Sequence, residues 1–216
     1  MSEVFIALDG RPLDEAVRQS FALLPARAKR APVSVLLSGA LARPFVFGPV
    51  KGLRGWREAH AAATAAAASA CDVDAACQVA LQGDARSTAA LATAVETATL
   101  NAVYALATDR GLRVRAVRPV WAVAIERAGA AAKQVSTFAC RDPDALVVLA
   151  EDGQQWRHAS VHCPAPRDLH ALLRRTTMGL DLDARSWVVV DVSMGPAAGA
   201  AGPTFTSSNL DMESPP

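Results

Sequence analysis

The sequence has few aromatic side chains and no excess of charge of either sign. Aromatic residues make up 5% of the chain although hydrophobic residues make up 51%, and alanine dominates the hydrophobic set. An apolar composition built on alanine favours helices rather than membrane-spanning segments. The formal charge is +1, from 22 basic and 21 acidic residues, so no overall field draws the chain to nucleic acid or anionic lipid. We therefore expect no nucleic-acid partner, and we expect the tryptophans to anchor the core: Trp56, Trp121, Trp156 and Trp187.

Long apolar runs are also lacking. The longest, Ala59 to Ala70, is interrupted by a histidine, a threonine and a serine, and is too short and too weakly hydrophobic to span a bilayer. Met1 to Leu8 includes Glu3 and lacks the basic segment of a signal peptide. These absences predict a cytoplasmic protein that meets a membrane only through a partner.

Cysteine is too sparse for a disulfide scaffold, since the chain has four cysteines and none of them is in a C-x-x-C motif. We expect reduced, mostly buried thiols. The closest group of metal-ligand types is His158, His162 and Cys163 on an expected strand. A strand places the two histidines on one face and the cysteine on the other. No metal site is therefore expected there.

Common catalytic and phosphate-binding motifs are absent. The sequence has no G-x-S-x-G elbow, no G-x-x-x-x-G-K-[ST] loop and no G-x-G-x-x-G loop. Ser38 is interpreted as a serine at a strand end. Asp142 and Asp144 flank a proline, and turn formation explains both. We therefore predict a protein with no catalytic residue, that is, not an enzyme, and with no cofactor.

Two acidic residues at the ends of expected strands leave one alternative to a non-catalytic protein open. Asp9 precedes Gly10 after the first expected strand, and Asp191 stands shortly before Gly195 after the last. An acidic residue in this position holds a hydrated metal against phosphate in some folds. Asp9 leads into a helix, however, and not into a hairpin whose amides could hold phosphate. The alternative is a nucleotide-dependent enzyme that uses Asp9 and Asp191.

Apolar runs of strand length and of helical period alternate in the first part of the chain. Strands are expected at Val4–Leu8, Val33–Leu37, Phe45–Phe47, Cys77–Leu81 and Val114–Val117, and helices at Leu13–Leu24, Trp56–Ser69 and Pro119–Arg127. The run Val33–Leu37 is apolar without alternation, which predicts burial on both faces. Phe45–Phe47 follows closely enough to be the returning arm of a hairpin.

A long helix is expected between Asp84 and Gly111. Asp84 or Ser87 can cap its start, and Gly111 offers a left-handed exit at its end. Apolar residues at helical spacing form its inner stripe: Leu91, Val95, Ala98, Ala102 and Leu106.

The second part of the chain reads as strand, strand, strand, helix, strand. The expected elements are Val135–Cys140, Leu146–Ala150, Trp156–His162, a helix from about Arg167 to Thr177, and Trp187–Val192. Turn residues between the first three strands predict an antiparallel meander. The expected organisation is a module over 1–129, a smaller module over 130–193 and a tail over 194–216. The tail composition predicts disorder, and we expect the tail to be dispensable for folding.

A succession of phrases resembles one family. They are Val33 to Pro44, Trp56-Arg57-Glu58-Ala59, Gly111 to Pro119 with Ala124 to Arg127, Leu146 to Trp156, Leu172 to Arg175, and Gly179-Leu180. In this order they resemble the actin-like cytoplasmic proteins of type IV pilus and type II secretion machines, the PilM and GspL type. The resemblance spans roughly residues 30 to 192.

The resemblance implies an α/β fold of two actin-like, ribonuclease-H-like modules of mixed sheet with helices. It implies a scaffold role, docking an inner-membrane pilus or secretion assembly protein at the cytoplasmic face of that membrane. PilM-type proteins are longer and carry glycine-rich nucleotide loops, and GspL-type proteins add a membrane-spanning helix and a periplasmic domain. None of these features is found in this sequence, so a reduced, nucleotide-free member is expected.

Basic residues between Arg110 and Arg118 are the expected partner contact. Arg113, Arg115 and Arg118 run into a strand that would border a cleft between the two modules, where ligands commonly bind. There they would pair with acidic residues of the partner and set its orientation. A solvated basic face is the alternative. A small regulator with no connection to such a machine is the third functional hypothesis.

Overall fold

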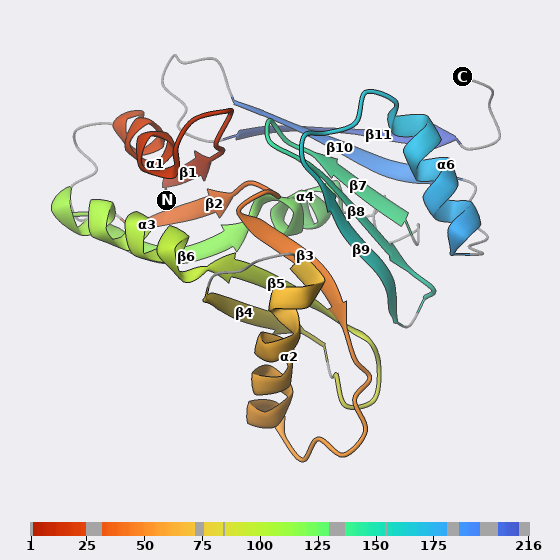
Figure 1. Cartoon of the computed structure of the whole chain (residues 1–216). Coiled ribbons are helices and arrows are strands. Elements are labelled where there is room, and N and C mark those ends of the chain that lie inside the picture. Colours follow the sequence, from red (N-terminus) through yellow and green to blue (C-terminus); the bar gives the residue numbers. More distant parts are fainter. Residues whose placement is uncertain are drawn as a thin grey trace.

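The computed structural model describes residues 2–24, 32–71, 76–83, 85–129, 137–153, 155–180, 186–194 and 203–211. The expected boundary at residues 129–132 lies almost entirely outside these ranges. The strands form three sheets, with the orders β1-β2-β6, β3-β5-β4 and β11-β10-β7-β8-β9 (Figure 1). Together with the helices they make a mixed α/β fold.

The first sheet is parallel and has β2 at its centre. Its elements are β1 (Ser2–Ile6), α1 (Leu13–Ala22), β2 (Pro32–Leu37), α3 (Thr97–Asp109) and β6 (Arg113–Pro119). Side chains of β2 alternate between two cores, so that Val35 packs on one face near α1 and α3, and Leu36 packs on the other. The prediction that this apolar run is buried on both faces is confirmed.

The second sheet is antiparallel and carries α2 on one face. Its elements are β3 (Ala42–Phe47), α2 (Trp56–Cys71), β4 (Cys77–Gln82) and β5 (Ala90–Glu96). The core between helix and sheet is built mainly from small side chains, such as Ala63 and Ala67 on α2 and Ala92 on β5. Alanines on both surfaces let the helix lie close to the sheet.

Two predictions fail in this sheet. Phe45–Phe47 pairs with β5 and does not return on β2 as a hairpin. The long helix expected between Asp84 and Gly111 is also wrong, because residues 90–96 form β5 and only 97–109 are helical. β5 lies between β3 and β4 and pairs with both. This pairing outweighs the helix propensity of its alanines, and the β-branched Thr93 and Val95 suit the strand.

The second half of the chain supplies the third sheet. Its elements are β7 (Thr137–Arg141), β8 (Leu146–Glu151), β9 (Trp156–His162), α6 (Leu169–Gly179), β10 (Ser186–Met194) and β11 (Pro203–Asp211). The expected meander is confirmed, and β10 joins it in parallel beside β7. Asp168 caps α6 by accepting a hydrogen bond from the Ala171 N–H at 2.8 Å.

The expectation of a disordered tail is wrong for residues 203–211. They form β11, which pairs with β10 along nine residue pairs. Phe205 packs against the neighbouring core, and the Arg127 guanidinium lies 4.3 Å from the centre of its ring. Composition alone did not predict this strand. Its backbone N–H and C=O groups pair with β10, and two apolar side chains, Phe205 and Leu210, join the cores, so most of its other residues can be polar.

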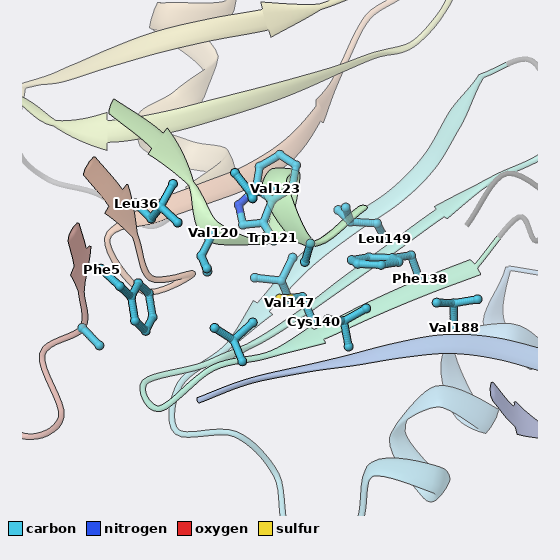
Figure 2. Close-up of a cluster of buried hydrophobic side chains, with 14 of the residues drawn as sticks. Phe5, Leu36, Val120, Trp121, Val123, Phe138, Cys140, Val147, Leu149 and Val188 are labelled. Atoms are coloured by element: carbon cyan, nitrogen blue, oxygen red, sulfur yellow. The ribbon is translucent and has the colours of Figure 1, made fainter. Parts of the chain in front are cut away.

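One core joins the first sheet to the third around α4 (Val120–Ala128). Figure 2 shows Phe5 and Leu36 of the first sheet, Trp121 of α4, and Val147 and Val188 of the third sheet in this cluster.

Two tryptophans are fully buried, as expected. The Trp121 indole N–H donates to the Ala42 carbonyl at 2.9 Å, and the Trp187 indole N–H donates to the Thr177 hydroxyl at 3.0 Å. Trp56 differs, because 55% of it is exposed. No helix within the described parts of the chain combines the length and the apolar character that crossing a membrane requires.

Candidate functional site

The turn between β7 and β8 lies against the carboxyl ends of β1 and β2. The Asp144 carboxylate accepts hydrogen bonds from the backbone N–H groups of Leu8 and Asp9, both at 2.6 Å. The Asp142 carboxylate accepts one from the Gly39 N–H at 2.7 Å. Two carboxylates from the second half of the chain thus hold the backbone of the first half.

Asp142 is the buried member of this pair. Its second carboxylate oxygen accepts from the N–H groups of Asp144 and Ala145, at 2.9 and 3.0 Å, which closes the turn. Burial raises the pKa of Asp142 to about 6, against the opposing effect of the three N–H donors. A Cβ atom at Gly39 would lie 2.5 Å from the side chain of Val147, so a larger residue there would require the buried Val147 to move.

This contact occupies a place where ligands often bind. In open α/β sheets, ligands bind beyond the carboxyl ends of the parallel strands, where backbone N–H groups attract anions. Here the chain's own carboxylates occupy the N–H groups of Leu8, Asp9 and Gly39. Turn formation, which the sequence indicated for Asp142 and Asp144, explains only the local bonds. No local signal could reveal the others, because they join residues separated by 103 to 136 positions.

Two cavities lie beside this contact, and Arg43 and Cys163 line both. One, of about 370 Å³, is lined by Leu8, Arg11, Leu41 and Thr99 among others, and the second, of about 400 Å³, by Pro44, Cys71, Ser160 and Val161 among others. The second lies where β3 runs beside β9 (Figure 1). We name the pair of cavities the Arg43 cleft.

The Arg43 side chain is fixed in this cleft. Its Nε–H donates to the Ala40 carbonyl at 3.1 Å, and a terminal N–H donates to the Cys71 carbonyl at 2.6 Å. Sequence reasoning did not select Arg43. A lone arginine before a proline at the start of a strand carries no local signal of a cleft.

The thiols of the cleft are poor nucleophiles. Burial raises the pKa of the Cys71 thiol to about 11, and it also raises the pKa of Cys163. Both thiols are therefore protonated at neutral pH, and only the thiolate attacks or binds metal well. The expectation of mostly buried thiols holds for Cys71 and Cys140, whereas Cys163 is exposed.

The two histidines of β9 share a face, as the sequence indicated. The Ser160 hydroxyl lies between them, 2.9 Å from His158 Nε2 and 3.1 Å from His162 Nε2. Burial lowers the pKa of both imidazoles, which favours their neutral forms. Within the described ranges, no three histidine, cysteine or acidic side chains converge as metal ligands.

Asp9 and Asp191 belong to separate ion pairs. The exposed Asp9 carboxylate lies 3.6 Å from the Arg11 guanidinium, and its backbone has a left-handed φ of 47°. Asp191 accepts a hydrogen bond from Arg141 Nε at 2.6 Å, between neighbouring residues of β10 and β7. This bond raises the pKa of Arg141. Each carboxylate thus faces a cation of its own chain.

The three predicted partner-binding arginines lie on β6, at an edge of the first sheet. Arg113 and Arg115 are exposed, and Arg115 is the extra residue of a bulge opposite β2. Arg118 forms an ion pair with Glu126 of α4. The arginines that line the Arg43 cleft are Arg11 and Arg43 rather than these three.

Comparison with known proteins identifies the class of fold. A structure from Bacteroides thetaiotaomicron VPI-5482, described as a protein with an actin-like ATPase fold and unknown function, matches 84% of this chain and 77% of its own, at 9% identity and a TM-score of 0.53. The chain therefore has an actin-like α/β fold. No protein-family model and no curated protein sequence matches it.

Two further solved structures match with lower TM-scores. The cytoplasmic domain of EpsL, an inner membrane component of the type II secretion system of Vibrio cholerae, is 17% identical over 74% of this chain, with a TM-score of 0.44. The PilM-PilN type IV pilus biogenesis complex is 14% identical over 79% of this chain, also with a TM-score of 0.44. This chain spans 59% and 52% of the lengths of those chains.

Proposed function

We propose that this protein is a non-catalytic assembly component of a type IV pilus or type II secretion-like apparatus. In this role it binds a cytoplasmic segment of an inner-membrane partner. One observation carries the non-catalytic part: Asp142 and Asp144 occupy the N–H groups at the ends of β1 and β2. A nucleotide phosphate at that place would have to displace two carboxylates and would be repelled by their charge. The apparatus itself is proposed from the ordered sequence resemblance over roughly residues 30 to 192.

The Arg43 cleft is the proposed place for the partner segment. Its second cavity lies between β3 and β9, which are edge strands of their sheets. Extended peptides commonly bind at such edges through backbone hydrogen bonds. Arg11, Arg43 and Glu96 line the cleft, so its charged lining is two cations and one carboxylate. These features fit an extended segment with at least one acidic residue.

The arginines of β6 are proposed as an outer contact for the same partner. Arg113 and Arg115 are exposed, and Arg118 is partly exposed beside Glu126. Charges in such a position orient a partner and speed its association more than they add to affinity.

A pull-down from the native cell tests the proposal. The unmodified protein should recover an inner-membrane pilus or secretion component. Arg43→Glu should not recover it, because a carboxylate in the cleft would repel the acidic residue of the partner segment. Arg113→Glu with Arg115→Glu tests the outer contact alone. The double variant Arg174→Glu with Arg175→Glu is a matched control on the exposed face of α6.

Three outcomes would count against parts of the proposal. Recovery of no such component by the unmodified protein overturns the docking role. Equal recovery by Arg43→Glu overturns the cleft assignment only. Calorimetry showing micromolar binding of magnesium ATP, with hydrolysis that Asp191→Ala abolishes, overturns the non-catalytic role and favours the enzyme that uses Asp9 and Asp191.

A further inference from the structure

A basic and aromatic group projects at one end of the molecule. The loop between β3 and α2, together with the first turn of α2, lies at the free end of that helix (Figure 1). Lys51, Arg54 and Arg57 are exposed there, and so is 55% of Trp56. We name these four residues the basic tip.

Two hydrogen bonds from backbone N–H groups hold the loop of the basic tip in place. The Val50 N–H donates to the Ala85 carbonyl at 3.1 Å, which fastens the base of the loop to the neighbouring turn. Glu58 is the acidic residue of this stretch, and its carboxylate accepts from the Arg54 N–H at 2.6 Å. No ion pair within the described part of the chain involves Lys51, Arg54 or Arg57. The three cationic residues are exposed, so their charges are accessible from solvent.

We propose that the basic tip binds the surface of an anionic lipid bilayer directly. Lysine and arginine near such a surface are attracted to its anionic lipids. A tryptophan ring is amphipathic and settles at the level of the headgroups. The exposed ring of Trp56 lies between Arg54 and Arg57 in the sequence, so one short segment presents both kinds of contact.

The arrangement favours lipid over nucleic acid. Nucleic-acid sites track the phosphate backbone with extended basic grooves, and single-strand sites add rows of stacking aromatics. The tip has one exposed tryptophan at the end of a helix, and the whole chain carries a net charge of only +1. Its place at the free end of α2 lets this small group reach a flat surface.

The contact is expected to be weak and to orient the protein. One cation near an anionic surface changes partitioning about five-fold, so three change it about one hundred-fold together. Such a contact positions the protein and does not anchor it. This inference does not depend on the proposed docking role, because it concerns the chain alone and a lipid surface.

Co-sedimentation of the full chain with vesicles tests the inference. The protein should bind phosphatidylglycerol-rich vesicles in low salt, bind pure phosphatidylcholine vesicles much less, and dissociate as salt is added. The triple variant Lys51→Glu, Arg54→Glu and Arg57→Glu should lose at least ten-fold in partitioning. Trp56→Ala should lose several-fold, since the ring contributes apolar contact.

Matched controls separate the tip from general charge. The triple variant Arg18→Glu, Arg174→Glu and Arg175→Glu makes the same charge change at other exposed positions, and Tyr104→Ala removes another half-exposed aromatic ring. Both should bind vesicles like the unmodified protein. Absence of vesicle binding, or equal losses in the control variants, overturns the inference. Tip-dependent binding to DNA or RNA with no binding to vesicles overturns it in favour of a nucleic-acid surface.

Discussion

Asp142 and Asp144 show how much depends on single side chains in this protein. A buried carboxylate is costly unless its oxygens are satisfied, and three backbone N–H groups satisfy Asp142. Gly39 makes the approach possible because a side chain there would collide with Val147. The contact between Asp142 and Gly39 thus adds a specific hydrogen bond between the two halves.

The titration of Asp142 makes a pH-dependent contribution to stability. Its folded pKa of about 6 lies above the ordinary value of 3.8, so the folded chain holds this proton more tightly than the unfolded chain. Its contribution to the free energy of unfolding is fully present below about pH 4 and is lost as the pH rises through about 6. We expect a loss of about 3 kcal/mol over the whole titration, from well below pH 4 to well above pH 6.

Asp142→Asn removes this titration, and denaturant unfolding from pH 4 to pH 7 measures it. The wild-type protein should lose about 2 kcal/mol relative to the variant between pH 4 and pH 7. The variant also alters the hydrogen-bond acceptors of the turn. The informative quantity is therefore how the difference in the free energy of unfolding between the two proteins changes with pH. A difference that stays flat across this range contradicts the prediction.

At the scale of elements, β11 changes the expected role of the C-terminal part. Composition predicted a tail that folding does not need, but residues 203–211 cover the edge of β10. Phe205 joins the shared core, and Leu210 joins the core beneath α6. The strand therefore contributes to two cores and closes one side of the sheet.

Removal of residues 195–216 should destabilise the protein. The deletion exposes the backbone of β10 and removes the contacts of Phe205 and Leu210, for an expected loss of about 3 kcal/mol or more. Phe205→Ala, which leaves the strand in place, should cost about half as much. Thermal unfolding followed by circular dichroism measures both. An unchanged melting temperature in the truncated protein would restore the view that this segment is dispensable.

For the whole molecule, the shared core links the two expected modules. Phe5 and Leu36 come from the first sheet, Val147 and Val188 from the third, and Trp121 of α4 lies among them (Figure 2). Neither side of this core is covered without the other. The division into 1–129 and 130–193 remains a prediction about the chain, and its two parts are not expected to fold alone.

Expression of residues 1–129 alone tests this dependence. The fragment exposes the α4 side of the first sheet, so we expect no cooperative thermal transition and strong binding of a hydrophobic dye. The full chain is the control. A cooperative transition in the isolated fragment would show that the first module is an independent folding unit.

The sequence by itself determined most strands and helices, the meander of the second half and the α/β class. These depend on local periodicity, caps and turn residues, which neighbouring positions carry. The actin-like resemblance also came from the order of short phrases. Only the tertiary structure decided the strand at residues 90–96, the pairing of β11, the Arg43 cleft and the contact of Asp142 and Asp144 with the first half. Each depends on partners distant in the chain, and long-range pairing can outweigh the local propensity of a segment such as residues 90–96.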